Sequence, residues 1–195
     1  MPLTLPPGPF AAYHFDLDGT VADSMPLHYR AWSTAVAEHG GAFPEDLFYA
    51  WGGVPLLKVV EMLNEHFGYT MDPKAVVARK ESLYLSLLDE VKPVVSVLAV
   101  LEAETGRRPF AIVSGSPRDS IEKTLNTLGL RHYFPVLVGA EDYTHGKPDP
   151  EPFLTAARLL NVPPAECLVF EDAEAGIAAA KAAGMQWVHV PTRPV

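Results

Sequence analysis

The chain has a single cysteine, Cys167, among its 195 residues. One thiol excludes an internal disulfide, and such sparing use of cysteine is typical of proteins in the reducing cytoplasm. Cys167 lies in an apolar stretch, where a buried inert thiol is more common than a nucleophile. Residues 1–9 have neither the basic head nor the apolar stretch of a secretion signal, so we expect a cytoplasmic protein.

Positive charge is also scarce. The chain has 15 lysines and arginines against 24 aspartates and glutamates, which gives a net charge of −9. This balance argues against a general affinity for nucleic acid or for anionic membranes. No apolar run approaches the roughly 20 residues of a membrane span. A phosphorylated small molecule is compatible with the charge if positive side chains are supplied locally, and we expect a monomer.

The apolar share of 48% is sufficient for a buried core. Between residues 25 and 92 no strand pattern interrupts a series of helical ones. Apolar residues recur at helical spacing over 26–38 and 56–67, and a further helix is predicted from Pro73, with Asp72 as its N-cap. We therefore expect an all-helical insert at residues 25–92.

From residue 93 onward the pattern alternates between helix and strand. Together with an apolar run at the N-terminus, the predicted strands cover 10–15, 110–113, 136–138, 167–170 and 187–190. Short apolar strands separated by helices predict an α/β fold with a doubly wound parallel sheet, of the Rossmann-like kind. The expected domains are a catalytic core of residues 1–24 and 93–195 and the helical insert of residues 25–92. In such sheets, ligands bind beyond the carboxyl ends of the strands.

The first predicted strand ends in two aspartates, Asp16 and Asp18. Residues two apart in an extended segment point the same way, so both carboxylates can face one pocket. Two unit charges about 4 Å apart repel by roughly 4 kcal/mol at an effective dielectric of about 20. A divalent cation relieves that repulsion, and Gly19 allows a sharp turn beneath a ligand. The alternative, a solvated turn at a strand end, stays open because Asp and Gly are ordinary turn residues.

The later strand ends also carry polar side chains, namely Ser114, Ser116, Lys147, Glu171 and Asp172. Each has a structural interpretation. Ser116 can N-cap a helix from Pro117, with Asp119 completing a capping box, and Asp172 can cap the helix that follows it. Asp149 can cap a helix from Pro150 and leave Lys147 as a solvated loop residue. Because all of them converge on one sheet edge, they also fit a metal-plus-phosphate site.

Four segments together resemble the motifs of the haloacid dehalogenase-like hydrolases in order and spacing: DLDGTV at 16–21, Ser114, Lys147-Pro148 and FEDAEAGI at 170–177. The resemblance covers essentially the whole chain, with the helical insert as a cap domain. Residues 23–32 resemble the β-phosphoglucomutase branch of that superfamily. Residues 106–109 and 129–134 are similar to bacterial fructose-1-phosphatase-like members of the branch.

The resemblance implies a mechanism. Asp16 would be the nucleophile that takes the phosphoryl group, and Asp18 the general acid and base. Mg²⁺ would be held by the Asp16 carboxylate, the Asp18 backbone carbonyl and Asp172, with Glu171 in support. Ser114 and Lys147 would bind the remaining phosphoryl oxygens, and Lys147 would offset the charge of Asp16.

The resemblance also implies substrate contacts, for which the candidates are Thr20, His28, Lys58, Lys80, Ser116 and Arg118. His28 and Lys80 match cap residues that lie near the substrate in the β-phosphoglucomutase branch. Each has an alternative: Lys80 lies on an apolar stripe and can snorkel to an edge, His28 can pack as structure beside Trp32, and Lys58 can be simply solvated.

The implied function is a Mg²⁺-dependent phosphatase that hydrolyses small sugar phosphates of the fructose 1-phosphate kind. The alternative is a β-phosphoglucomutase that interconverts β-glucose 1-phosphate and glucose 6-phosphate. Where the mutases carry an arginine for the distal phosphate, this chain reads GGVPL at 52–56, which favours hydrolysis. A dehalogenase is disfavoured because that branch needs neither Mg²⁺ nor an acid and base at Asp18. A binding module without enzymatic activity is disfavoured because it does not need Asp18.

Overall fold

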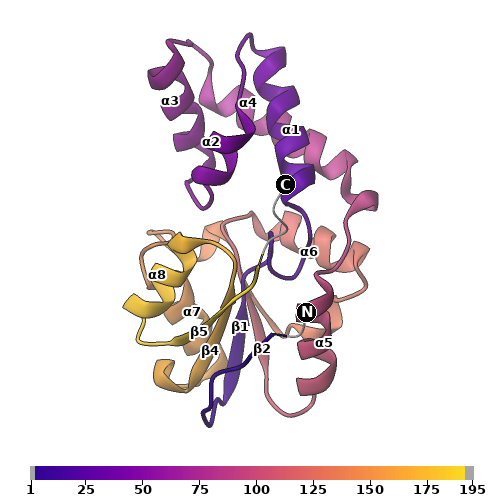
Figure 1. The fold of residues 1–195 in the computed structure, drawn as a ribbon, viewed down its shortest axis with the longest axis vertical. Coiled ribbons are helices and arrows are strands. Elements are labelled where there is room, and N and C mark those ends of the chain that lie inside the picture. Colours follow the sequence, from indigo (N-terminus) through magenta and orange to yellow (C-terminus); the bar gives the residue numbers. More distant parts are fainter. Residues whose placement is uncertain (1–2, 192–195) are drawn as a thin grey trace. The chain divides into compact units, whose positions relative to one another are not determined.

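The computed structural model describes residues 3–191. A parallel sheet forms the centre of the larger of its two compact units (Figure 1). Its five strands are β1 (Ala12–Phe15), β2 (Phe110–Val113), β3 (Val136–Val138), β4 (Cys167–Glu171) and β5 (Gln186–His189). They lie in the order β3-β2-β1-β4-β5, and every neighbouring pair is parallel. The predicted doubly wound parallel sheet is confirmed. The strand order reverses direction beside β1, which places the topological switch point between the ends of β1 and β4.

The helices of this unit follow the strands in alternation. They are α5 (Val95–Glu104), α6 (Arg118–Thr127), α7 (Glu151–Leu160) and α8 (Glu174–Ala182), with short 3-10 turns η2 (Arg131–Tyr133), η3 (Ala140–Asp142) and η4 (Pro164–Glu166). The strands β2, β3, β4 and β5 agree with the predicted ranges to within one residue. The first strand is shorter than expected, because only four of the six residues in the apolar run pair with β2 and β4.

The core of the sheet separates into two faces because side chains alternate along each strand. On one face, aromatic rings pack together: the rings of Phe15 and Phe170 stack with centroids 4.5 Å apart, and Tyr13 stacks on Phe110. On the other face, small side chains of β1 and β4 pack against Ala156 of α7 and Ala180 of α8. Asp16 lies on this second face, since it is four residues after Ala12. The close packing of both faces fixes the ends of the central strands.

Residues 24–91 form a second compact unit, separate from the unit of residues up to 23 and from 92 onward. It contains α1 (Met25–Glu38), α2 (Glu45–Ala50), α3 (Leu56–Phe67), α4 (Pro73–Ser86) and the 3-10 turn η1 (Leu88–Glu90), and its residues, all of them described, include no strand. As predicted, Asp72 caps α4, and its carboxylate accepts a hydrogen bond from the Lys74 amide at 3.0 Å.

Two details of this unit differ from the prediction. The short helix α2 was not expected, because six residues are too few to show a helical period. Phe67, the last residue of the apolar helical pattern over 56–67, is 38% exposed instead of buried, since it lies in the last turn of α3. Within the described residues, no helix has both the length and the apolar character needed to cross a membrane.

Candidate active site

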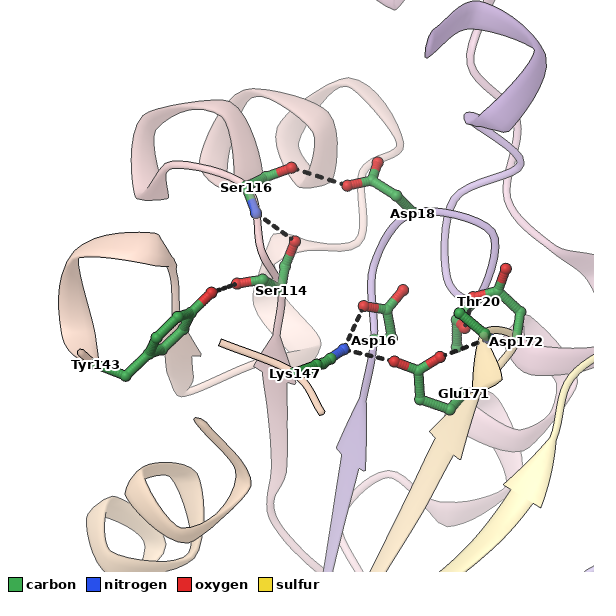
Figure 2. Close-up of polar contacts among 10 residues, drawn as sticks. Asp16, Asp18, Thr20, Ser114, Ser116, Tyr143, Lys147, Glu171 and Asp172 are labelled. Atoms are coloured by element: carbon green, nitrogen blue, oxygen red, sulfur yellow. Dashed lines mark hydrogen bonds and ion pairs between the residues drawn. The ribbon is translucent and has the colours of Figure 1, made fainter. Parts of the chain in front are cut away.

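Three acidic side chains meet where β1 and β4 end, at the switch point of the sheet (Figure 2). Asp16 follows β1, Glu171 is the last residue of β4, and Asp172 comes directly after it. One oxygen of each carboxylate lies within 4.8 Å of the other two. Asp16 and Glu171 are buried, and Asp172 is partly buried. Residues 155 positions apart in the chain are therefore joined in one site, which is the arrangement that the motif order predicts.

The turn after β1 is shaped to receive Asp172. Gly19 has a φ of 94°, and a Cβ atom at this position would collide with the Asp172 carboxylate. The turn is closed by backbone hydrogen bonds from residues 20, 21 and 22 to the carbonyl of Leu17. The Thr20 hydroxyl lies 3.1 Å from Oδ1 of Asp172 and donates a hydrogen bond to it. Thr20, expected to contact substrate, thus orients a member of the acidic cluster in this structure.

Glu171 has both carboxylate oxygens engaged by the protein. Its Oε1 lies 2.6 Å from Nζ of Lys147, and its Oε2 accepts a hydrogen bond from the Ala173 amide at 2.8 Å. Gly176 in α8 makes room for this side chain, because a Cβ atom there would overlap the Glu171 carboxylate. This arrangement fits a supporting role for Glu171 better than a role as a direct metal ligand.

Lys147 is the cation of the site. Its Nζ lies 2.7 Å from Oδ1 of Asp16 and 2.6 Å from Oε1 of Glu171, and its side chain is only 9% exposed. The Phe153 ring lies 5.1 Å from Nζ on another side. Burial alone would lower the pKa of Lys147, but the charges of Asp16 and Glu171 outweigh it and raise the pKa. Lys147 is therefore a permanently charged ammonium that links two carboxylates, and not a solvated loop residue.

Burial disfavours the charged forms of Asp16 and Asp172. Burial is the largest cause that raises the pKa of Asp16 well above its ordinary value, and the charge of Lys147 opposes it. Burial, followed by the charge of Glu171, raises the pKa of Asp172 to about 7. With all three carboxylates ionised, one ammonium leaves an excess of two negative charges among largely buried side chains. A divalent cation with a preference for oxygen ligands balances that excess, so the residues fit Mg²⁺.

The raised pKa of Asp172 predicts how stability changes with pH in a metal-free sample. Its pKa in the folded protein, about 7, lies above the ordinary value of 3.8. The group therefore favours the folded state fully below about pH 4, and this advantage is lost as pH rises through about 7. Because Mg²⁺ binds the ionised form, we expect Mg²⁺ to stabilise the protein more at pH 8 than at pH 5.5.

Thermal melts with MgCl₂ and with a chelator at both pH values measure this difference. Mg²⁺ at about 100 times its dissociation constant stabilises by roughly 2.7 kcal/mol, which is about 5–10 °C for a chain of this size. The control is Asp172→Asn, which should raise the chelated melting temperature at pH 8 and abolish the response to Mg²⁺. An equal Mg²⁺ response at both pH values would contradict the assignment of Asp172 as a Mg²⁺ ligand.

Ser114 stands at the end of β2, beside β1 (Figure 2). Its side chain is buried, and its Oγ accepts a hydrogen bond from the Ser116 amide at 3.0 Å. The hydroxyl of Tyr143 donates to the Ser114 carbonyl at 3.2 Å and braces the strand end. Tyr143 was not predicted, since nothing in its local sequence distinguishes it from any loop tyrosine.

The possible helix caps have different outcomes. The Ser116 hydroxyl does not cap α6, whose N-cap is Pro117; it donates instead to Oδ2 of Asp18 at 2.9 Å. The capping interpretation of Ser116 is therefore wrong. Asp172 does not cap α8 either, because Ala173 is its N-cap. The N-cap of α7 is Pro150, and Asp149, one residue earlier, accepts a hydrogen bond from the Glu151 amide at 2.9 Å.

The other predicted substrate contacts lie in varied surroundings. Arg118 is exposed, and its guanidinium pairs with Asp142. In the second unit, Lys58 has a side chain 56% exposed and pairs with Glu61 at 3.2 Å. These two contacts are ordinary surface ion pairs, which are worth at most about 1 kcal/mol and can yield to another anion.

Lys80 and His28 are buried inside the helical unit. The Lys80 side chain is 3% exposed, with its Nζ 2.8 Å from Glu81 and 5.4 Å from the centre of the Tyr84 ring. His28 stacks on the same Tyr84 ring, with the two ring centroids 3.9 Å apart. Lys80 thus does not simply snorkel into solvent. A substrate contact for either residue stays a prediction.

Comparisons with known proteins agree with this geometry. The model of the haloacid dehalogenase-like hydrolases matches residues 10–184. Fructose-1-phosphate phosphatase YqaB of Escherichia coli is 38% identical over 182 residues, which are 93% of this chain and 96% of that protein. The phosphorylated carbohydrates phosphatase of Thermotoga maritima is 32% identical and matches 90% of this chain and 82% of its own.

The solved structure of β-phosphoglucomutase from Clostridium difficile superposes with a TM-score of 0.79 at 28% identity, over 91% of this chain and 83% of that one. The family match, over residues 10–184, spans the strand ends that carry the acids, Ser114 and Lys147. On these grounds the chain belongs to the haloacid dehalogenase-like hydrolase family and is one of its phosphatases.

Proposed function

We propose that the protein is a Mg²⁺-dependent phosphatase that hydrolyses small sugar phosphates, of which fructose 1-phosphate is the type, through an aspartyl-phosphate intermediate. The observation that carries the proposal is the Asp16 carboxylate, held by Lys147 at 2.7 Å within a cluster of acids at the switch point. The names of two relatives, which act on fructose 1-phosphate and on phosphorylated carbohydrates, support the substrate class. Action as a cytoplasmic monomer stays a prediction from the sequence.

The metal would be held by the carboxylates of Asp16 and Asp172 and by the backbone carbonyl of Asp18, with Glu171 in support. When bound, Mg²⁺ supplies positive charge against the phosphoryl oxygens. Lys147 supplies a second positive charge from the protein itself. In phosphoryl transfer the charge spreads over three oxygens, so fixed donors account for most of the catalysis. The Ser114 hydroxyl can serve as one more such donor.

The first step transfers the phosphoryl group to the protein. An Asp16 oxygen forms a bond to phosphorus while the bond from phosphorus to the sugar oxygen breaks. Asp18, in its protonated form, gives its proton to that oxygen, and the sugar leaves as a neutral alcohol. An alkoxide is a poor leaving group, so this proton transfer is needed for sugar esters.

The second step restores the enzyme. A water molecule attacks phosphorus, its proton passes to the Asp18 carboxylate, and the bond from phosphorus to Asp16 breaks. Inorganic phosphate is released, and Asp18 is again protonated for the next cycle. The same side chain therefore acts first as acid and then as base, which requires that it stays close to the reacting oxygen in both steps.

A panel of sugar phosphates, assayed for inorganic phosphate with Mg²⁺ and with a chelator, tests the proposal. We expect release from fructose 1-phosphate or a similar small ester, dependent on Mg²⁺. The mutase alternative, favoured by the likeness to β-phosphoglucomutase, predicts conversion of β-glucose 1-phosphate to glucose 6-phosphate without phosphate release. Absence of release from every ester in the panel would refute the phosphatase proposal.

A further inference from the structure

We propose that Ser116 is a positioning residue for Asp18, which it holds in the orientation needed for proton transfer. The inference rests on the proposed role of Asp18 as acid and base. The Ser116 hydroxyl donates a hydrogen bond to Oδ2 of Asp18 at 2.9 Å (Figure 2). The two residues are 98 positions apart, and both are partly buried. The contact joins the loop after β2 to the turn after β1.

The backbone of Ser116 is anchored from two directions. Its amide donates to Oγ of Ser114 at 3.0 Å, and its carbonyl accepts from the amide of Ala140 at 3.1 Å. Gly139 permits this close approach, because a Cβ atom there would lie 3.1 Å from the Ser116 carbonyl oxygen and 3.0 Å from the Arg118 nitrogen. These hydrogen bonds tie the Ser116 backbone to the residue after β2 and to η3, so the position of its hydroxyl is fixed.

The fixed hydroxyl of Ser116 restricts the orientation of the Asp18 side chain. Asp18 lies in the turn after β1, beyond the paired residues of the sheet, where an aspartate side chain has several rotamers available. A general acid must stay within hydrogen-bond reach of the oxygen that it protonates. A hydrogen bond from a fixed hydroxyl selects one orientation of the carboxyl group and reduces the entropy lost on reaching the transition state.

The hydroxyl has no capping role that would explain its presence, since α6 is capped at Pro117 without a side-chain hydrogen bond. A direct substrate contact, the role that the family resemblance implies for Ser116, is the competing explanation. The two roles differ in one respect. Loss of a substrate contact weakens binding of every ester of similar size, whereas loss of positioning matters only when the leaving group needs a proton.

Two aryl esters of similar size separate these roles. Phenyl phosphate releases a basic phenolate that benefits from protonation, while 4-nitrophenyl phosphate releases a much less basic one. The value of kcat/KM covers only the steps up to departure of the leaving group. General acid catalysis contributes about 10²–10⁴-fold, and a misdirected acid loses part of that. For Ser116→Ala we expect kcat/KM to fall roughly tenfold on phenyl phosphate and less than about twofold on 4-nitrophenyl phosphate.

Three further variants complete the experiment. Ser116→Thr keeps the hydroxyl and should restore kcat/KM on phenyl phosphate. Thr127→Ala, which removes an exposed hydroxyl at the far end of α6, should leave both values unchanged. In an Asp18→Asn background, Ser116→Ala should add no further discrimination between the esters, because the two residues act as one unit.

An equal loss on both esters, or no loss on either, would overturn the positioning role. Asp16→Asn, assayed on the same esters, keeps this outcome distinct from failure of the proposed function. If Asp16→Asn retains turnover, the phosphatase mechanism itself fails. If Asp16→Asn is inactive while Ser116→Ala shows no leaving-group effect, only the positioning inference fails.

Discussion

Replacement of Asp16 by Asn is expected to lower phosphate release by at least about 10⁴-fold, the scale seen when a covalent nucleophile is removed. The amide has the shape of the carboxylate but is not a nucleophile, so no aspartyl-phosphate can form. The fold should survive, because burial raises the pKa of Asp16 and its charge is therefore unfavourable in the folded state. Lys147 keeps its contact with Glu171 in the variant.

Two measurements test this prediction. Steady-state phosphate release gives the rate, and mass spectrometry of acid-quenched samples detects a phosphorylated protein in the wild type alone. Asp119→Asn is the matched control, since Asp119 is an exposed aspartate of α6 that pairs only with Lys123 among the contacts described. A rate for Asp16→Asn above about a tenth of the wild-type rate would rule out the nucleophile assignment.

Replacement of Lys147 by Met is expected to affect both activity and stability. The variant keeps an unbranched side chain of nearly the same length but removes the charge that neutralises Asp16 and Glu171. Removing one partner of a buried ion pair typically costs about 3–5 kcal/mol, because the remaining charge is left unpaired. For a chain of this size that corresponds to a fall in melting temperature of roughly 10 °C. Activity should fall by at least about 10²-fold, since a fixed donor to the phosphoryl group is lost.

The loss of stability should depend on pH. Without Lys147, the pKa of Asp16, already raised by burial, rises further. A carboxyl group with a raised folded pKa favours the folded state at low pH and loses that advantage as pH rises. In chelator, the deficit of Lys147→Met is therefore expected to be larger at pH 8 than at pH 5. Lys123→Met, at an exposed position of α6, is the control. A deficit that is the same at both pH values would contradict the role of Lys147 as the counter-charge.

Much of the site was predictable because polar residues interrupt apolar strands. The runs that became β1 and β4 end in acids, and a parallel sheet brings its carboxyl ends to one edge. The motif order then predicted the family, which the comparisons confirm. Local rules also placed Asp72 at the start of α4, since an N-cap depends only on residues close in the chain.

Other features were beyond the sequence because they depend on partners far away in the chain. The sequence suggested substrate contacts for Thr20 and Ser116. It gave no sign of the hydrogen bonds that their hydroxyls donate to Asp172 and Asp18, across separations of 152 and 98 residues. Nothing in the sequence around Tyr143 indicates its hydrogen bond to the carbonyl of Ser114 at the end of β2. The helix α2, with six residues, is too short to show a helical period in the sequence.

The sequence by itself determined which residue types stand at the strand ends, and hence the chemistry available to the protein, because strand and turn patterns are local. Only the tertiary structure decided the lateral order of the strands and the partner of each side chain. A hydroxyl or a carboxylate has several acceptors or donors within reach of its rotamers. The one that it meets is chosen by how the distant strands and helices pack.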